Sequence, residues 1–332
     1  MIDSFRIRRP WLWLPSSFAH DVFPIALKVG AKFRSYQTYS WQSFDWRGLH
    51  FANPLGIAAG LDKNATQIKD WWTYGPGFIE IGTVVPHPQL PNSGPILSRN
   101  TQQRAIWNRM GFPSRGMEYV KQQLMELGEN KHTPLFINIG KNRDTKLEVA
   151  HKDYCELIHH LDFFADTFVI NISSPNTQGL RQLLTRGWFQ DFLGPIIEKR
   201  NSIGNTPLLV KLSPDLDEQA LRFCLETSLE MGIDGWVLTN TTLARKPNIV
   251  FPKEGGVSGA PLRELSLQML KNSISILGDK KKDHLLVSVG GVLSPEDVLE
   301  RIEFGADLVQ SYAALVFEGP GFFKNVHRFV RS

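Results

Sequence analysis

The sequence predicts an α/β protein in which eight parallel strands and their helices close a (β/α)8 TIM barrel, preceded by a short N-terminal helical extension. Two observations support this. A short run of apolar and β-branched residues recurs eight times, with segments of helix length between most of the runs. Strands that are apolar throughout and alternate with helices are typical of a parallel sheet buried on both faces, and eight of them close a barrel.

The predicted strands follow one another in chain order. They are PLGIAAG (54–60), GFIEIGTVV (77–85), PLFINIG (134–140), FVINIS (168–173), PLLVKLS (207–213), GWVLTNT (235–241), LLVSVGG (285–291) and DLVQSYA (307–313). Segments between them, such as DYCELIHHLDFFA, repeat apolar residues at three and four positions, as amphipathic helices do. The connection after the second strand is much longer than an ordinary βα loop, which predicts a lid or binding loop.

Residues 1–42 form the predicted extension, with one or two short helices in WLWLPSSFAHDVFPIALKVGAKF, Ser16 or Ser17 as N-cap, and Pro24 kinking or dividing them. One face carries Phe18, Val22, Ile25 and Val29, and the flanking basic residues are Arg6, Arg8, Arg9, Lys28, Lys32 and Arg34. This pattern suits a helix lying in a membrane interface, and a helix capping the barrel bottom is the alternative. No apolar run reaches the roughly 18 residues of a membrane span.

Composition and charge argue against other classes. Hydrophobic residues make up 42% and charged residues 21% of the chain, as in ordinary globular proteins. The net charge is +4, without a Lys/Arg block interleaved with aromatic residues, so no nucleic-acid partner is expected. Cys155 and Cys224 lie far apart, outside any metal-binding spacing, so neither a disulfide framework nor a metal site is predicted.

The chemistry of a TIM barrel lies at the carboxyl ends of its strands. The residues that end the predicted runs are Lys63, Thr83, Asn138, Asn171, Lys211, Thr239, Asn240, Gly290, Gly291 and Tyr312. A single Asn or Thr at such a position could simply make a turn. Two lysines and three asparagines at equivalent ends favour a site instead.

The glycine-rich segments GGVSG (255–259) and VGGV (289–292) are predicted turns that could cradle a phosphate group. Small residues at 58–60 would let a flat ring approach, and a lysine at its edge would tune a flavin. The amides of Asn108, Asn171, Asn176 and Asn240 match the alternating C=O and N–H groups of a cyclic ureide.

Ser174, next to Pro175, is the candidate base for abstracting a proton. Serine is a poor base by itself, so Thr177 with a bound water is the suggested relay. The neighbouring Ser173 is expected to be only a turn or cap hydroxyl.

Together the motifs NPLGIAAGLDK, IEIGTV, NRMGF, INIGKN, NISSPNTQGLR, VKLSPDL, TNTT, GGVSG and VGGV resemble those of dihydroorotate dehydrogenase, over roughly residues 45–325. The resemblance implies oxidation of (S)-dihydroorotate to orotate with FMN as hydride acceptor, in de novo pyrimidine (UMP) biosynthesis. Cytosolic members use a cysteine as the base. Ser174 and the N-terminal extension resemble the membrane-associated class 2 members instead, which pass electrons to a quinone.

The family motifs also imply individual contacts. For FMN they imply Ala59, Gly60, Leu61, Asp62, Lys63, Thr83, Asn138, Asn171, Lys211, Thr239, Gly259, Gly291, Tyr312 and Ala313. For dihydroorotate they imply Lys63, Asn108, Arg109, Met110, Gly111, Phe112, Asn171, Asn176, Asn240 and Thr241. For a quinone tunnel they imply His20, Arg99 and Tyr312. Ala313 stands where the family usually has a hydroxyl, and the lid loop 85–114 departs from the family pattern.

The resemblance implies membrane association, and the absence of a transit peptide and of a spanning helix favours a bacterial protein, peripheral on the cytoplasmic face of the inner membrane. A monomer or weak oligomer is expected. Two other interpretations stay open. One is a related flavin barrel that reduces uracil-like rings with NAD(P)H or on tRNA, although its cysteine acid/base is absent from the Ser174 loop. The other is a membrane-associated flavin-binding protein without turnover.

Overall fold

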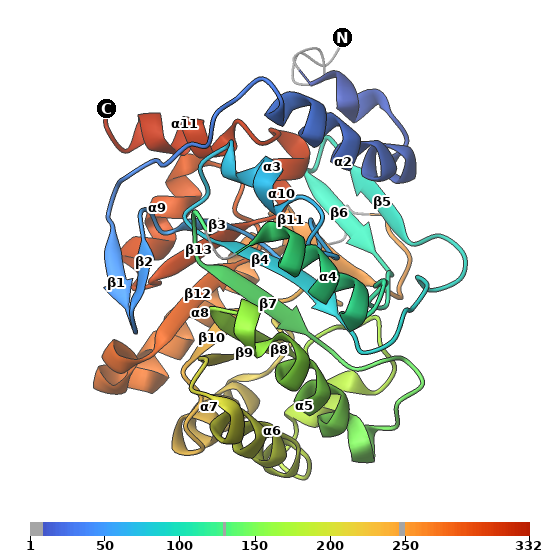
Figure 1. The fold of residues 1–332 in the computed structure, drawn as a ribbon, viewed down its shortest axis with the longest axis vertical. Coiled ribbons are helices and arrows are strands. Elements are labelled where there is room, and N and C mark those ends of the chain that lie inside the picture. Colours follow the sequence, from blue (N-terminus) through green and yellow to red (C-terminus); the bar gives the residue numbers. More distant parts are fainter. Residues whose placement is uncertain (1–8, 129–130, 246–249) are drawn as a thin grey trace.

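Eight parallel strands close a barrel in the order β10-β12-β13-β3-β4-β7-β8-β9, which confirms the predicted (β/α)8 architecture. The strands are β3 (Leu55–Ile57), β4 (Ile79–Val84), β7 (Leu135–Ile139), β8 (Thr167–Asn171), β9 (Leu208–Leu212), β10 (Gly235–Leu238), β12 (Leu285–Val289) and β13 (Leu308–Ser311). This computed structural model describes residues 9–128, 131–245 and 250–332 (Figure 1). Each strand is shorter than its predicted run, mainly because the residues at the carboxyl end leave the ladder.

Helices surround the barrel (Figure 1). The longer ones are α4 (Met117–Leu127), α5 (Ala150–Leu161), α6 (Phe189–Ile203), α7 (Glu218–Glu230), α8 (Arg263–Leu277), α9 (Pro295–Glu303) and α11 (Phe322–Phe329). The shorter ones are α3 (Ile68–Trp72), α10 (Ala313–Phe317) and the 3-10 turns η2 (Leu147–Val149), η3 (Asp162–Phe164), η4 (Leu180–Leu184), η5 (Ala260–Leu262) and η6 (Gly278–Asp283). Two of the longer helices have a side-chain N-cap. Asp217 caps α7 by accepting from the backbone N–H of Ala220, and Ser294 with Asp297 forms a capping box at α9.

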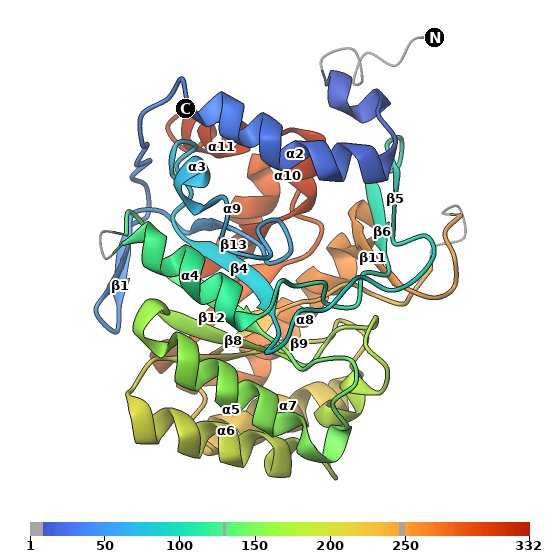
Figure 2. The ribbon, with the colours of Figure 1, turned by 45° about the vertical axis from the view of Figure 1, so that its right-hand side comes forward.

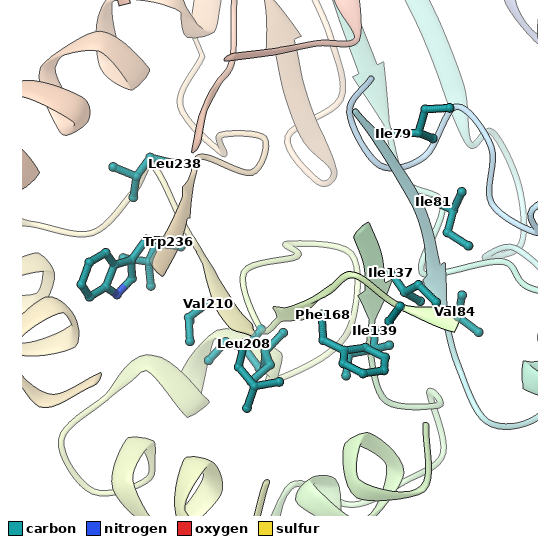
Figure 3. Close-up of a cluster of buried hydrophobic side chains, with 14 of the residues drawn as sticks. Ile79, Ile81, Val84, Ile137, Ile139, Phe168, Leu208, Val210, Trp236 and Leu238 are labelled. Carbon is teal, nitrogen blue, oxygen red and sulfur yellow. The ribbon is translucent and has the colours of Figure 1, made fainter. Parts of the chain in front are cut away.

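Side chains alternate between the two faces of each barrel strand. Outward positions such as Ile79 and Ile81 belong to the large cluster packed between strands and helices (Figure 3). Inward apolar positions such as Phe136 and Val169 fill the barrel itself. The polar inward positions, among them Glu80, lie on the same strands and interrupt otherwise apolar runs.

The barrel bottom is closed by a hairpin of β1 (Phe44–Trp46) and β2 (Leu49–Phe51). Phe51 is fully buried, and its ring contacts the rings of Phe78 and Phe136 with centroids 6.0 and 6.2 Å away. Aromatic packing therefore seals this end and leaves the carboxyl end for the site.

The long connection after β4 contains two strands, β5 (Leu97–Asn100) and β6 (Ala105–Asn108), which pair antiparallel. The segment GGVSG, predicted as a turn, forms a third strand, β11 (Gly256–Gly259), on the other side of β6. Glycine is required there by close approach, since a Cβ on Gly256 would lie 1.8 Å from the Thr241 hydroxyl. That prediction was wrong because the pairing partner lies about 150 residues away in the chain.

The described part of the extension contains a 3-10 turn, η1 (Pro10–Trp13), and one helix, α2 (Ser16–Ala31). The predicted serine N-cap is wrong: Pro15 occupies that position, and no side chain caps the helix. Pro24 lies inside α2 without dividing it. Tertiary packing opposes the break, since Phe23 packs on Trp71 with ring centroids 5.7 Å apart.

Helix α2 contacts α3 and β5 and lies away from the β1–β2 hairpin, so it does not cap the barrel bottom (Figure 2). Arg99 of β5 fastens this segment by donating to the carbonyls of Trp11 and Leu14, at 2.9 and 2.7 Å. Arg6 and Arg8 lie outside the described residues. Within the described ranges, no helix combines the length and apolar character needed to cross a bilayer.

Candidate active site

A cavity lies at the carboxyl ends of the barrel strands, beside the β5–β6–β11 sheet. Most of the predicted FMN and dihydroorotate residues line it: Ala59, Gly60, Lys63, Thr83, Asn108, Met110, Gly111, Phe112, Asn171, Ser174, Asn176, Lys211, Thr239, Asn240, Thr241, Gly259, Gly291, Tyr312 and Ala313. The barrel therefore gathers strand ends that are spread over some 250 residues of sequence into one place.

Of the residues predicted for FMN, dihydroorotate and catalysis, five do not line this cavity. They are Leu61, Asp62, Asn138, Arg109 and Thr177. Asp62 instead shapes its own loop, accepting bonds from the backbone N–H groups of Thr66 and Gln67 at 3.0 and 2.8 Å, and burial raises the pKa of this carboxyl. Arg109 points to the surface, where it pairs with Glu254 at 3.0 Å.

The cavity floor contains a buried carboxylate that the sequence analysis missed. Glu80 on β4 is fully buried and lies 3.2 Å from the Lys211 ammonium, and Asn138 donates to it at 2.6 Å. Gln310 of β13 donates to its other oxygen. A fully buried ion pair is stable only when its remaining hydrogen-bonding groups are also satisfied. The sequence did contain a signal for this buried group, because Glu80 and Gln310 are single polar residues at inward positions of otherwise apolar strands.

Above this floor the asparagines form a connected network. Asn171 donates to Thr83 and Asn138 at 3.0 and 3.1 Å, and Asn240 donates to the Asn171 side chain at 3.2 Å. Ser173, predicted as a turn hydroxyl, joins this network: it donates to Asn171 at 3.2 Å and accepts from Asn240 at 3.1 Å. The network fixes how the amides face the cavity.

The loop after β8 carries the candidate base. Ser174 is buried, and its hydroxyl oxygen accepts from the backbone N–H of Asn176 at 3.2 Å. The Asn176 amide donates to Asn108 of β6 at 2.8 Å, which ties this loop to the three-stranded sheet. Three buried polar atoms here lack a partner among the residues that the structure describes: Asn176 Oδ1, Thr177 Oγ1 and Thr241 Oγ1. Orphaned polar atoms beside a cavity indicate a polar ligand.

Arg181, at the end of the same loop, is a second residue that the sequence analysis missed. Its guanidinium donates to the carbonyls of Ser173 and Thr241, both at 2.9 Å, and pairs with Asp215 at 2.6 Å. It thus joins the loops that follow three different barrel strands. No spacing rule indicates such a clamp, because its partners lie up to 60 residues away.

Backbone forms the opposite wall of the cavity. Gly60 has φ +95°, and a Cβ there would face the Tyr312 ring at 3.5 Å. Gly291 has φ +71°, and a Cβ would lie 2.4 Å from the Arg263 Cα, so only glycine fits. A wall of bare backbone lets a flat ring and a phosphate group approach closely.

A second cavity of about 500 Å³ lies beneath α2 and includes His20, Arg99 and Tyr312 in its lining, so the structure brings the three predicted tunnel residues together. The two cavities share a wall, formed by the residues that line both of them: Lys63, Leu97, Ile106 and Tyr312. Arg99 mainly holds η1 and α2 in place through the carbonyl contacts described above. Leu61, absent from the first cavity, lines this one.

Lys63 and His20 meet at the shared wall, 3.3 Å apart. Burial, together with the charge of Lys63, lowers the pKa of His20 to about 4, so the imidazole is neutral at physiological pH. Burial lowers the pKa of Lys63 to about 8, partly offset by Asp62. Burial also raises the pKa of Tyr312 to about 12, so its phenol stays neutral. The wall therefore holds one cation beside two neutral groups.

Comparisons with known proteins agree on one family. The family model described as dihydroorotate dehydrogenase matches residues 43–332. A dihydroorotate dehydrogenase (quinone) of Thermus thermophilus is 42% identical over 278 residues, covering 83% of this chain and 78% of that protein. One of Coxiella burnetii is 38% identical over 339 residues, covering 98% and 96%. The crystal structure of Eimeria tenella DHODH in complex with ferulenol has a TM-score of 0.85 and 31% identity, covering 95% and 90%.

Proposed function

This chain is a member of the dihydroorotate dehydrogenase family, and on that premise we propose that FMN accepts the hydride from (S)-dihydroorotate and that a membrane quinone then takes up the electrons. Oxidation of dihydroorotate to orotate with a quinone as acceptor is the reaction of the quinone-dependent members in pyrimidine biosynthesis. The enzyme is accordingly an oxidoreductase.

One observation supports this substrate most directly. Ser174 lines the same cavity as Asn108, Asn176 and Asn240. Asn176 and Thr241, which carry two of the orphaned polar atoms, also line it. A cyclic ureide with a carboxylate offers alternating donors and acceptors to such a set, and Lys63 would pair with the charge.

Ser174 is the proposed base that removes the substrate's proton. Because the Asn176 N–H occupies one lone pair of its oxygen, the other remains to accept a proton from the substrate. Thr177 is buried three residues after Ser174, and its hydroxyl has no partner within the described part of the chain, which suits the role of passing that proton on through a water. Arg181 positions the base by holding the carbonyl of Ser173.

The residues of the cavity fit FMN, which when bound supplies the hydride acceptor. Lys211 would face the ring edge, with Glu80 holding the ammonium in place. Thr83 and the asparagine network would contact the ring. The end of β11 at Gly259 and the turn at Gly291 would receive the phosphate, where Ala313 contributes only backbone. Of the predicted contacts, Leu61, Asp62 and Asn138 would act through the loop or floor rather than by touching the cofactor.

The quinone would occupy the cavity beneath α2, separated from the flavin by Lys63 and Tyr312. Residues 1–42 would then be the membrane-facing hood and residues 43–332 the catalytic barrel. Phe18, Ile25 and Val29 form an exposed apolar stripe on α2, with Lys28 and Lys32 beside it. This arrangement supports peripheral binding to a membrane, which we propose to be the cytoplasmic face of the bacterial inner membrane. We further propose that the protein acts as a monomer or weak oligomer.

Anaerobic mixing with dihydroorotate tests the proposal. Flavin absorbance should bleach rapidly and return when a long-chain quinone is added. A uracil-reducing relative would bleach with NADPH instead, and a binding protein without turnover would bleach with neither. Absence of bleaching by dihydroorotate in FMN-loaded, folded protein would overturn the assignment.

A further inference from the structure

Arg301 of α9 is a buried cation whose hydrogen-bond partners are all neutral. Its side chain is 1% exposed, and its guanidinium donates to the hydroxyls of Ser288 and Ser266 at 2.7 and 2.9 Å and to the carbonyl of Gly290 at 2.5 Å. Burial lowers its pKa to about 10, so the group is still positively charged at neutral pH.

The nearby carboxylates are committed elsewhere. Asp297 and Glu300 both pair with Arg263, each at 2.5 Å, and Asp297 also accepts from two backbone N–H groups at the start of α9. Within residues 9–128, 131–245 and 250–332, no carboxylate comes within ion-pairing distance of Arg301. Asp297, Glu300 and Glu264 therefore attract Arg301 only through space, and the first two share their charge with Arg263. A buried cation behind the wall of a cavity favours an anion in that cavity.

The contact at Gly290 places this charge at the cavity. Gly290 and Gly291 both line it, and the Gly290 carbonyl is held from below by the Arg301 guanidinium and by the Ser266 hydroxyl, which donates at 2.6 Å. In a trans peptide the C=O and the following N–H point in opposite directions. Holding the carbonyl toward Arg301 therefore turns the Gly291 N–H away from it, toward the cavity side.

We propose that Arg301 is the positioning residue of a phosphate subsite: it balances the charge of a phosphate monoester at the Gly290–Gly291 turn and aims the Gly291 N–H at it. The inference rests on the proposed function, in which that monoester is the end of FMN. It concerns the discrimination between phosphorylated and unphosphorylated flavin, and leaves the chemistry at the ring unchanged.

Flavin-free, full-length protein titrated with FMN and with riboflavin provides the test, because riboflavin lacks only the phosphate. Flavin fluorescence reports both affinities without turnover. Arg301→Gln should weaken FMN binding by ~10- to 100-fold, the loss of a charge-assisted contact, while riboflavin binding changes by less than about threefold. Arg301→Lys, which retains the charge, should keep part of the preference for FMN.

Arg200 offers a matched control, since it is also buried but pairs with Asp234 at 2.8 Å, near the amino-terminal ends of the strands. Arg200→Gln should lower stability without altering the ratio of the two flavin affinities. If Arg301→Gln does not fold, Ser266→Ala decides, since it removes one support of the Gly290 carbonyl and should weaken FMN binding about fivefold and riboflavin binding little. If the ratio of FMN affinity to riboflavin affinity is unchanged in the folded variant, only the inference about Arg301 is overturned. If the wild-type protein binds neither flavin, the proposed function is overturned.

Discussion

The two cavities of this molecule are built in opposite ways. The strand-end cavity is formed by the barrel, and its polar side chains bond to one another through Glu80, Asn138 and Asn171. The cavity beneath α2 is mainly apolar, and one of its walls is a helix attached by a few side chains such as Phe23 and by the carbonyl contacts of Arg99.

The difference indicates how the two half-reactions depend on structure. Groups that act on charge as it develops must be positioned in advance, because reorganising them during the reaction would raise the barrier. A site for a long apolar molecule needs only volume and apolar surface, which a helix on the barrel's edge can supply. Changes in the barrel should therefore impair flavin reduction, and changes in α2 should impair flavin reoxidation.

The largest effect is expected at the base. Ser174→Ala should slow flavin reduction by dihydroorotate by ~10²- to 10⁴-fold, the usual loss when general-base catalysis is removed. FMN content and orotate binding should be unchanged, and Ser174→Cys should recover part of the rate. Stopped-flow absorbance of the flavin measures it, and reduction of the alanine variant at the wild-type rate would refute this role.

Lys211→Met should impair FMN binding and flavin reduction together, by ~10-fold or more. It should also destabilise the fold by about 3–5 kcal/mol, because Glu80 would be left buried without its cation. The double variant Lys211→Met with Glu80→Gln should regain much of that stability but not the reduction rate. Urea denaturation and stopped-flow absorbance separate the two effects. Equal recovery of both would mean that Lys211 serves stability alone.

The exposed apolar stripe of α2 allows a test of the second cavity, because α2 forms one of its walls. Phe18 and Ile25 are 52% and 64% exposed, and replacing both with serine should lower binding to anionic liposomes by ~10-fold or more. Turnover with a long-chain quinone in vesicles should fall, while turnover with a soluble dye is retained.

Phe163 and Met125 are also exposed but lie on η3 and α4, so their replacement by serine is the matched control and should leave liposome binding unchanged. If both double variants behave alike, α2 has no special role at the membrane.

The smallest effect concerns His20. Its pKa of about 4 in the folded protein lies below the ordinary 6.5, so between these values the unfolded chain binds more protons. The free energy of unfolding should therefore fall as pH drops from 6.5 toward 4. His20→Asn should remove this part of the pH dependence, as measured by urea denaturation at several pH values. An unchanged slope would show that the buried imidazole titrates normally.

Local pattern was sufficient to predict the barrel and much of the candidate site. Eight apolar runs with helices between them admit few topologies, and a parallel barrel necessarily brings the strand ends together. Lys63, Asn171 and Lys211 could thus be assigned to one cavity from their positions alone, and the family motifs indicated which ligands to expect.

Only the tertiary structure decided which groups meet across the barrel. Lys211 and Glu80 are 131 residues apart, and Arg181 reaches a carbonyl 60 residues away. The pairing of β11 with β6 and the unbroken course of α2 through Pro24 likewise depend on distant partners. Periodicity shows which face of a strand or helix a side chain occupies, but the residue opposite it is set by barrel closure and packing, which no local spacing specifies.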